Sequence, residues 1–249
     1  MPPPRILTIA GSDSSGGAGI QADIKTITVL GGYAMSAITA ITAQNTLGVS
    51  AVEVLAPELV AAQIDACLSD IGVNAIKIGM LGSADIAAVV TERLAALRVP
   101  IVFDPVMIAT SGSALADDAT IAAFERLMRL ATLTTPNVAE LAALGGHDEM
   151  AARGIAYLAK GGDGTSERVE DLLVQPGEEP QIMAGTRIHT RHTHGTGCTL
   201  SSAIATYLGK GLPLPEAVDR ARLFVRSALR AAPGFGAGAG PLGHGDARG

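Results

Sequence analysis

Short apolar runs alternate with longer helical patterns along most of the chain, and this alternation constrains the fold more than any other feature. The predicted strands cover residues 5–10, 33–42, 49–55, 73–78, 99–103, 155–159, 169–174 and 181–188, and a further short strand leads into residues 135–137. The predicted helices cover residues 18–30, 57–71, 84–97, 117–130, 137–144, 199–208 and 215–231. Strands that alternate with helices build a mostly parallel sheet with helices on both faces. The sequence therefore predicts an α/β fold arranged as a three-layer sandwich.

A single domain is expected from the length. The chain has 249 residues, and we assign residues 1–232 to one large α/β domain. Residues 233–249 are rich in glycine and alanine, a composition typical of flexible linkers, so we expect a mobile tail. The sequence has no apolar run long enough for a signal peptide or a membrane span. Cys67 and Cys198 are interpreted as reduced thiols, and we expect a cytoplasmic protein.

Charge and aromatic content narrow the choice of partners. The formal net charge is −6, without a basic patch, and aromatic residues make up only 3% of the chain. A duplex or an anionic membrane favours a basic surface, and single-stranded nucleic acid favours aromatic stacking platforms. We therefore expect neither nucleic acid nor a membrane as partner, and a small molecule becomes the expected ligand.

The position of the ligand follows from the predicted sheet. Ligands of open parallel sheets bind outside the carboxyl ends of the strands. Polar and glycine-rich segments follow the predicted strands at residues 11–19, 42–48, 79–82, 104–105, 137–140, 160–162 and 195–198. The sequence thus predicts the location of the binding site independently of the reaction that takes place there.

The most informative motif is the segment 194–200, in which two glycines precede a predicted helix. Backbone N–H groups of Gly195, Thr196 and Gly197 can converge there at a helix N-terminus and bind an anion or a developing phosphoryl charge. A thiol at that helix end is expected to have a lowered pKa, so Cys198 could accept the proton of a hydroxyl that attacks ATP. The alternative is a glycine-bounded helix start with an inert buried thiol.

Two carboxylates are candidates for a magnesium site. Asp104 stands at a strand end before proline, and Glu140 comes three residues after the predicted helix cap Asn137. Carboxylate oxygens with several retained waters suit Mg²⁺. Asp104 could instead cap a turn, and Glu140 could be a solvated carboxylate that favours the helix dipole. Lys160, before two glycines, could steer a phosphate tail.

The first glycine-rich loop, residues 11–19, is interpreted as the substrate side of the site. It lacks the Lys-Ser/Thr pair that a P-loop requires. Asp23 stands one helical turn further on and could bind a heteroaromatic amine, and Gln44 offers a donor and an acceptor to a pyrimidine edge. The alternatives are a helix-surface aspartate and a loop amide. A zinc site at His189, His192 and His194 lacks a fourth ligand with suitable spacing.

Seven strings of the sequence occur in a characteristic order, at residues 8–23, 42–46, 77–81, 104–107, 135–137, 160–162 and 193–200. Together they closely resemble the hydroxymethylpyrimidine/phosphomethylpyrimidine kinase family of thiamine biosynthesis. The resemblance implies the ribokinase-like fold. It also implies an enzyme that uses MgATP to phosphorylate 4-amino-5-hydroxymethyl-2-methylpyrimidine and then its monophosphate.

The resemblance assigns residues to the ligands. The pyrimidine is expected against Gly11, Asp23, Gln44 and Met80, with Cys198 in the position of the base. The nucleotide is expected at Asn137, Lys160, Gly162 and Thr193. A homodimer is expected as the assembly.

Two alternatives stay open. Pyridoxal kinases of the same fold also carry a cysteine at this position, although Gln44 within residues 42–46 is more similar to the pyrimidine enzymes. The interval between Glu140 and Lys160 is shorter than the family's usual crossover helix requires. A catalytically weak protein that binds the pyrimidine is therefore the second alternative.

Overall fold

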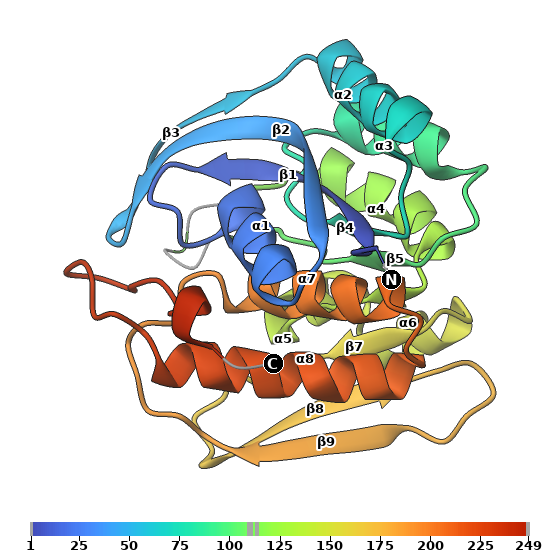
Figure 1. Cartoon of the computed structure of the whole chain (residues 1–249). Coiled ribbons are helices and arrows are strands. Elements are labelled where there is room, and N and C mark those ends of the chain that lie inside the picture. Colours follow the sequence, from blue (N-terminus) through green and yellow to red (C-terminus); the bar gives the residue numbers. More distant parts are fainter. Residues whose placement is uncertain (1, 109–111, 113–114, 248–249) are drawn as a thin grey trace.

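A computed structural model describes residues 2–108, 112 and 115–247 (Figure 1). A nine-stranded sheet forms its centre, in the order β3-β2-β1-β4-β5-β6-β7-β8-β9. The strands are β1 Arg5–Asp13, β2 Tyr33–Asn45, β3 Gly48–Val54, β4 Ala75–Ile78, β5 Ile101–Phe103, β6 Leu133–Thr134, β7 Tyr157–Ala159, β8 Arg168–Val174 and β9 Gln181–Thr186. The run from β2 to β7 is parallel, whereas β3, β8 and β9 join it antiparallel.

Helices cover both faces of this sheet. They are α1 Gly19–Val29, α2 Pro57–Asp70, α3 Ala84–Leu94, α4 Asp118–Leu130, α5 Val138–Ala143, α6 Gly146–Ala152, α7 Thr196–Gly209 and α8 Leu214–Arg230, with a short 3₁₀ turn, η1 His244–Asp246. One face packs against α2, α3 and α4, and the other packs against α1, α7 and α8 (Figure 1). The predicted α/β three-layer sandwich is confirmed.

Alternating side chains explain why both faces are covered. Leu7 and Ile9 join the cluster under α2–α4, whereas Ile6 joins the cluster under α1, α7 and α8. On β4, Ile76 packs in the cluster under α2–α4, and Ala75 packs in the cluster under α1, α7 and α8. Successive side chains of a strand point to opposite faces, so a strand that is apolar throughout must be buried on both sides.

The strand β1 extends further than predicted. Residues after Ala10 were expected to form a turn, but Ser12 and Asp13 continue to pair with β2 after a register shift. The glycine-rich loop therefore begins at Ser14, and Asp13 is the last residue of the strand rather than part of a mobile turn.

The short connection between β6 and β7 is filled by α5 and α6. Leu144 and Met150 are buried in the core under α4. Arg153 pairs with Glu125 of α4 at 2.7 Å and donates a hydrogen bond to the Leu144 carbonyl at 2.8 Å. The missing length is thus compensated by two short helices that pack against the core.

The C-terminal segment packs onto the domain, so the interpretation of residues 233–249 as a mobile linker is wrong for the part that the structure describes. Leu242, His244 and Ala247 are buried. The His244 ring lies 2.8 Å from the Thr199 hydroxyl, and the Gly243 N–H donates to the Ala228 carbonyl. Composition alone did not reveal these contacts. Among the described residues, no helix combines the length and the apolar character of a membrane span.

Replacing Leu242 by alanine tests this packing. Leu242 is 4% exposed, so Leu242→Ala should lower the free energy of unfolding by about 2–4 kcal/mol, measured by urea denaturation. Phe235, in the same segment, is 67% exposed, and Phe235→Ala is the matched control with an expected change below about 0.5 kcal/mol. Equal effects of the two substitutions would contradict the packed tail.

Candidate active site

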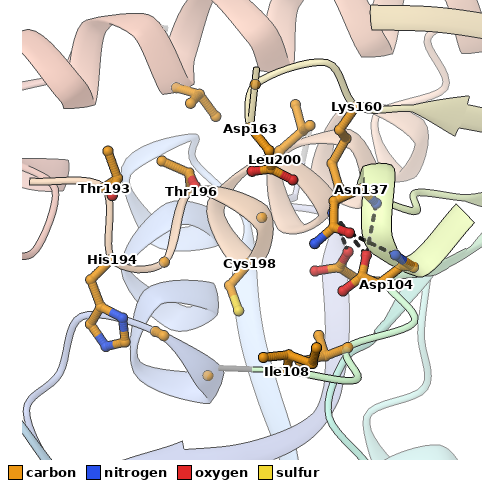
Figure 2. A pocket seen from close by; sticks show the side chains of 18 of the residues that line it. Asp104, Ile108, Asn137, Lys160, Asp163, Thr193, His194, Thr196, Cys198 and Leu200 are labelled. Carbon is orange, nitrogen blue, oxygen red and sulfur yellow. Dashed lines mark hydrogen bonds and ion pairs between the residues drawn. The ribbon is translucent and has the colours of Figure 1, made fainter. Parts of the chain in front are cut away.

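A cavity of about 720 Å³ opens at the carboxyl ends of the parallel strands (Figure 2). Residues that follow β1, β4, β5, β6 and β7 line it, together with the N-terminus of α7. The sequence-predicted residues that line the cavity are Gly11, Gln44, Met80, Asp104, Asn137, Glu140, Lys160, Gly162, Thr193, Gly195, Thr196, Gly197 and Cys198. The structure therefore brings together every predicted site residue except Asp23.

The turn before α7 is held by close backbone packing. Gly195 has a left-handed φ of 88°, and a Cβ at this position would lie 1.9 Å from the Gly17 carbonyl oxygen. Only glycine combines this φ with so close an approach. The first N–H groups of a helix lack intrahelical partners, and Gly197 and Cys198 line the cavity. The positive end of α7 consequently faces the cavity, as an anion site requires.

Two buried carboxylates share one lysine at the wall of the cavity. The Lys160 Nζ lies 2.8 Å from the Asp104 carboxylate and 3.8 Å from that of Glu140 (Figure 2). The Thr135 hydroxyl also donates to Asp104, at 3.0 Å. Asp104 is therefore not a simple turn cap, because its carboxylate contacts Lys160 and Thr135.

Glu140 is buried rather than solvated. It forms a capping box with Asn137: the Asn137 N–H donates to the Glu140 carboxylate, and the Glu140 N–H donates to the Asn137 side chain, both at 2.8 Å. The predicted helix cap at Asn137 is confirmed. Burial raises the pKa of Glu140 to about 7, with Lys160 opposing and Asp104 adding to the rise. Because this pKa is close to neutral pH, a nearby cation such as the Lys160 ammonium favours the charged form of Glu140.

The thiol of Cys198 differs from the sequence-based prediction. Burial raises the pKa of Cys198 to about 11, and the carboxylates of Asp23 and Asp104 add to the rise. Lys77 and a hydrogen bond from the Gly19 N–H act in the opposite direction. The expected lowering by the helix end is wrong for this protein without nucleotide, because burial and two carboxylates from other elements outweigh it. Cys198 is therefore a neutral thiol near pH 7.

Asp23 does not reach the cavity, which corrects its assignment to the substrate. Its side chain is fully buried and pairs with the Lys77 Nζ at 2.9 Å. The hydroxyls of Thr8 and Ser202 also donate to its carboxylate. Sequence reasoning missed this network because Lys77, on β4, is a buried lysine in an apolar strand, and only the three-dimensional arrangement shows its partner.

Asp13 and His194 form a second contact that sequence reasoning missed. The His194 Nε2 lies 2.8 Å from the Asp13 carboxylate, which also accepts the N–H groups of Gly17 and Ala18. Burial alone would raise the pKa of Asp13, but these hydrogen bonds, with those of Ser15, lower it to about 2. An aspartate in a Ser/Gly-rich loop is a recognisable turn signal, but its histidine partner lies 181 residues away.

His194 also lies beside the predicted substrate residue Gln44. The Gln44 Nε2 is 3.3 Å from the His194 Nε2, and the Thr42 hydroxyl is 3.3 Å from the Gln44 Oε1. His189, by contrast, pairs with Glu167 at 3.1 Å. Among the residues that the structure describes, no cluster of three or more His, Cys, Asp or Glu side chains is arranged for a metal.

The far end of the cavity contains residues that the sequence did not single out. Arg187 follows β9, and its guanidinium donates to the carbonyls of Ser166 and Gly162 at 2.7 and 2.8 Å. Val225 and Leu229, one turn apart on α8, add an apolar wall. An apolar wall with a few convergent polar groups is typical of small-molecule and cofactor sites.

The family model and a curated relative agree on one family, whereas the solved structures include two kinds of kinase. The family model for phosphomethylpyrimidine kinase matches residues 13–243. A hydroxymethylpyrimidine/phosphomethylpyrimidine kinase from Rhizobium meliloti is 47% identical over 255 residues, covering 96% of each chain. The crystal structure of phosphomethylpyrimidine kinase from Clostridium difficile has a TM-score of 0.76 at 40% identity, covering 90% of this chain and 98% of that one. Pyridoxal kinase from Staphylococcus aureus, in complex with ADP, has a TM-score of 0.88 at 33% identity and covers 98% and 94%.

Substitution of Gly195 tests the close packing of the turn. Gly195→Ala should lower the free energy of unfolding by about 2–5 kcal/mol, because it adds a clash with Gly17 to the left-handed strain. Gly211 is the matched control, since its φ is 87° and a Cβ there would meet nothing within 4 Å. Gly211→Ala should therefore cost only about 1–2 kcal/mol. Urea denaturation measures both, and equal losses would contradict the close contact.

Proposed function

The chain belongs to the phosphomethylpyrimidine kinase family, and from this premise we propose that it phosphorylates 4-amino-5-hydroxymethyl-2-methylpyrimidine and then its monophosphate in thiamine biosynthesis, with ATP as the phosphoryl donor. Its fold is the ribokinase-like three-layer sandwich. One observation carries the proposal: the positive end of α7 lies in the same cavity as Gln44 and the Asp104–Lys160–Glu140 cluster. A phosphoryl group at that helix end would have an acceptor on one side and a nucleotide on the other.

The acceptor end is proposed at Gly11, Gln44 and Met80. The Met80 thioether lies against Gly11, which supports an apolar slot for a flat ring. Gln44 presents an amide to the same cavity, next to Thr42 and His194. An amide can both donate to and accept from the edge of an aminopyrimidine.

The nucleotide end is proposed at Asn137, Lys160, Gly162 and Thr193. The related pyridoxal kinase from Staphylococcus aureus has been solved with ADP and with AMP-PCP, which supports a nucleotide site in this fold. The Lys160 ammonium, whose side chain is 14% exposed, lies near two carboxylates at the cavity wall. An ammonium close to a phosphate chain supplies a cation for its charge.

The proposed reaction is an in-line transfer. The acceptor oxygen forms a bond to the γ-phosphorus while the bond from that phosphorus to the departing ADP oxygen breaks. The amides of Gly195 and Gly197 stabilise the charge on the phosphoryl oxygens. The Thr196 N–H, which the sequence also offered for this role, instead donates to the Thr193 carbonyl at 3.2 Å. The hydroxyl proton passes to the Cys198 sulfur, which must be a thiolate to accept it. With a pKa of about 11, only a fraction on the order of 10⁻⁴ is thiolate at pH 7, so turnover should rise with pH.

Asp104 and Glu140 are proposed to hold Mg²⁺ through water. Their oxygens are hard ligands, and in this structure the two carboxylates already share a cationic group, the Lys160 ammonium. Two carboxylates without a third protein ligand fit a magnesium ion that keeps waters and binds substrate phosphates. Mg²⁺ held by Asp104 and Glu140 would supply positive charge for the phosphates of the nucleotide.

We also propose a homodimer in the cytoplasm. Val52 and Val54 share one face of the edge strand β3 and are exposed, and Leu47 is exposed in the turn before this strand. Exposed apolar side chains along an edge strand form a surface that a second copy of the chain could cover. Sedimentation velocity would measure the assembly. Both cysteines are free thiols, as expected in a reducing compartment.

A pyridoxal kinase is the second candidate, because the pyridoxal kinase from Staphylococcus aureus superposes with the higher TM-score. The sequence favours the pyrimidine, since the identity to the phosphomethylpyrimidine kinase is 40% against 33%. ATP consumption should be measured with the pyrimidine alcohol, with its monophosphate and with pyridoxal. Saturable turnover with both pyrimidine acceptors is expected. Turnover with pyridoxal alone would reverse the assignment, and no turnover with any acceptor would favour a weak binding protein.

Substitution of Cys198 tests its role as the base. Cys198→Ala should lower kcat by about 10²–10⁴-fold, because the acceptor proton loses its recipient. The matched control is Cys67→Ala, since Cys67 lies on α2 and does not line the cavity. Steady-state kinetics with the pyrimidine alcohol would measure both variants. Near-normal turnover of Cys198→Ala would remove this role and leave the anion-binding turn as the main contributor.

A further inference from the structure

A buried ion pair lies beneath the floor of the cavity. Lys77 on β4 and Asp23 on α1 are both fully buried, with 2.9 Å between the Nζ and the carboxylate. Burying two charges costs more free energy than a well-packed apolar pair would, so stability alone is a weak reason for such a pair. The proposed reaction, as described so far, uses neither residue.

The pair is aligned with Cys198 along the contact between α1 and α7. The Gly19 N–H donates to the Cys198 thiol, and the Ser202 hydroxyl donates to the Asp23 carboxylate at 2.6 Å. Gly19 and Asp23 are four residues apart on α1, and Cys198 and Ser202 are four residues apart on α7. Residues at this spacing lie on the same face of a helix, about one turn apart. Asp23, with Lys77 paired to it, therefore lies about one helical turn from the Cys198 thiol along the contact between α1 and α7.

Lys77 extends toward the cavity floor. A Cβ at Gly79 would lie 2.6 Å from the Lys77 Nζ and 3.2 Å from the Cβ of Ala10. Ala10 and Met80, the next residue after Gly79, both line the cavity. The ammonium is thus separated from the cavity by a floor of small residues, Ala10 and Gly79.

The charges around Cys198 come from three elements. Lys77 on β4 favours the thiolate, whereas Asp23 on α1 and Asp104 after β5 oppose it. The Gly19 N–H at the start of α1 is the neutral donor to the sulfur. Lys77 is consequently the cation that balances two carboxylates near the sulfur.

We propose that Lys77 is a positioning residue for the reaction: its buried ammonium stabilises the thiolate of Cys198, and Asp23 limits this effect by pairing with the ammonium. The catalytic role of Lys77 rests on the proposed function, because Cys198 needs to be a thiolate only if it accepts the proton of the substrate hydroxyl. The effect of the Lys77 ammonium on the Cys198 thiolate does not depend on a substrate or a nucleotide. Asp23 thereby acts through Lys77 rather than by touching the substrate.

Alkylation of Cys198 by iodoacetamide measures this relation without any turnover. The thiolate sulfur forms a bond to the reagent's methylene carbon while iodide leaves, so the rate follows the thiolate fraction. A Cys67→Ala background leaves Cys198 as the sole thiol of the chain, and intact-mass spectrometry follows the reaction between pH 7 and pH 10.

The decisive comparison is between Asp23→Asn and Asp23→Asn/Lys77→Met in that background. Both lack the carboxylate charge, and they differ only in the ammonium. Asp23→Asn should be alkylated about tenfold faster at pH 8 than the double variant, and also faster than the parent, because an opposite charge within a few ångströms favours the thiolate. A purely structural role would affect folding without this order of rates.

Three controls keep the outcome clear. Lys77→Met alone, which keeps the carboxylate, should be alkylated more slowly than the parent and carries the test if Asp23→Asn fails to fold. Lys210→Met removes an exposed lysine at the far end of α7 and should react like the parent. Circular dichroism checks the fold of each variant.

Equal alkylation of the two decisive variants, or slower alkylation of Asp23→Asn, would overturn the proposal. Its failure is distinguishable from failure of the proposed function. The alkylation rates test the coupling of Lys77 to Cys198, whereas ATP consumption with the pyrimidine tests the reaction.

Discussion

The contact between two backbone turns, one after β1 and one before α7, is the constraint on which the candidate site depends. The Gly17 carbonyl lies where a side chain at Gly195 would be, and the Asp13 carboxylate holds His194 in the same place. This contact fixes the turn before α7, and the N-terminus of the helix, with Gly197 and Cys198, lines the cavity. A change that separated these turns would move the helix end away from Gln44 as well, since Gln44 lies beside His194.

Charge balance is the second principle of the site. Asp104 and Glu140 share Lys160 at the wall, and Asp23 is paired with Lys77 beneath the floor. In a buried site, an unbalanced charge is expensive, so a nucleotide's phosphates cannot enter without a redistribution of cations. Lys160 lines the cavity together with the two carboxylates, so its ammonium is the cation of this cluster that an entering phosphate would meet. The same ammonium compensates the two carboxylates in a cavity that the positive end of α7 also faces.

The sequence predicted those features that depend on nearby residues. Strand period, the cap at Asn137 and the glycine turn at Gly195 are local patterns, and the structure has all three. Contacts between residues far apart in the sequence could not be predicted from these local patterns. The partner of Asp23 is 54 residues away, and Cys198 is surrounded by charges from β4, α1 and the end of β5, which reversed the expected direction of its pKa. The tail was misjudged in the same way, because glycine content hides the burial of Leu242.

Choice of substrate must depend on a few side chains, because the scaffold itself is shared with kinases of different vitamins. The pyridoxal kinase from Staphylococcus aureus superposes with a TM-score of 0.88, although its identity is lower than that of the phosphomethylpyrimidine kinase from Clostridium difficile. A fold can host several functions, and the site decides among them. At the proposed acceptor end, the Gln44 amide is oriented from both sides, by Thr42 and His194. Since His194 also belongs to the turn before α7, the proposed recognition of the ring edge and the proposed anion site depend on the same contact.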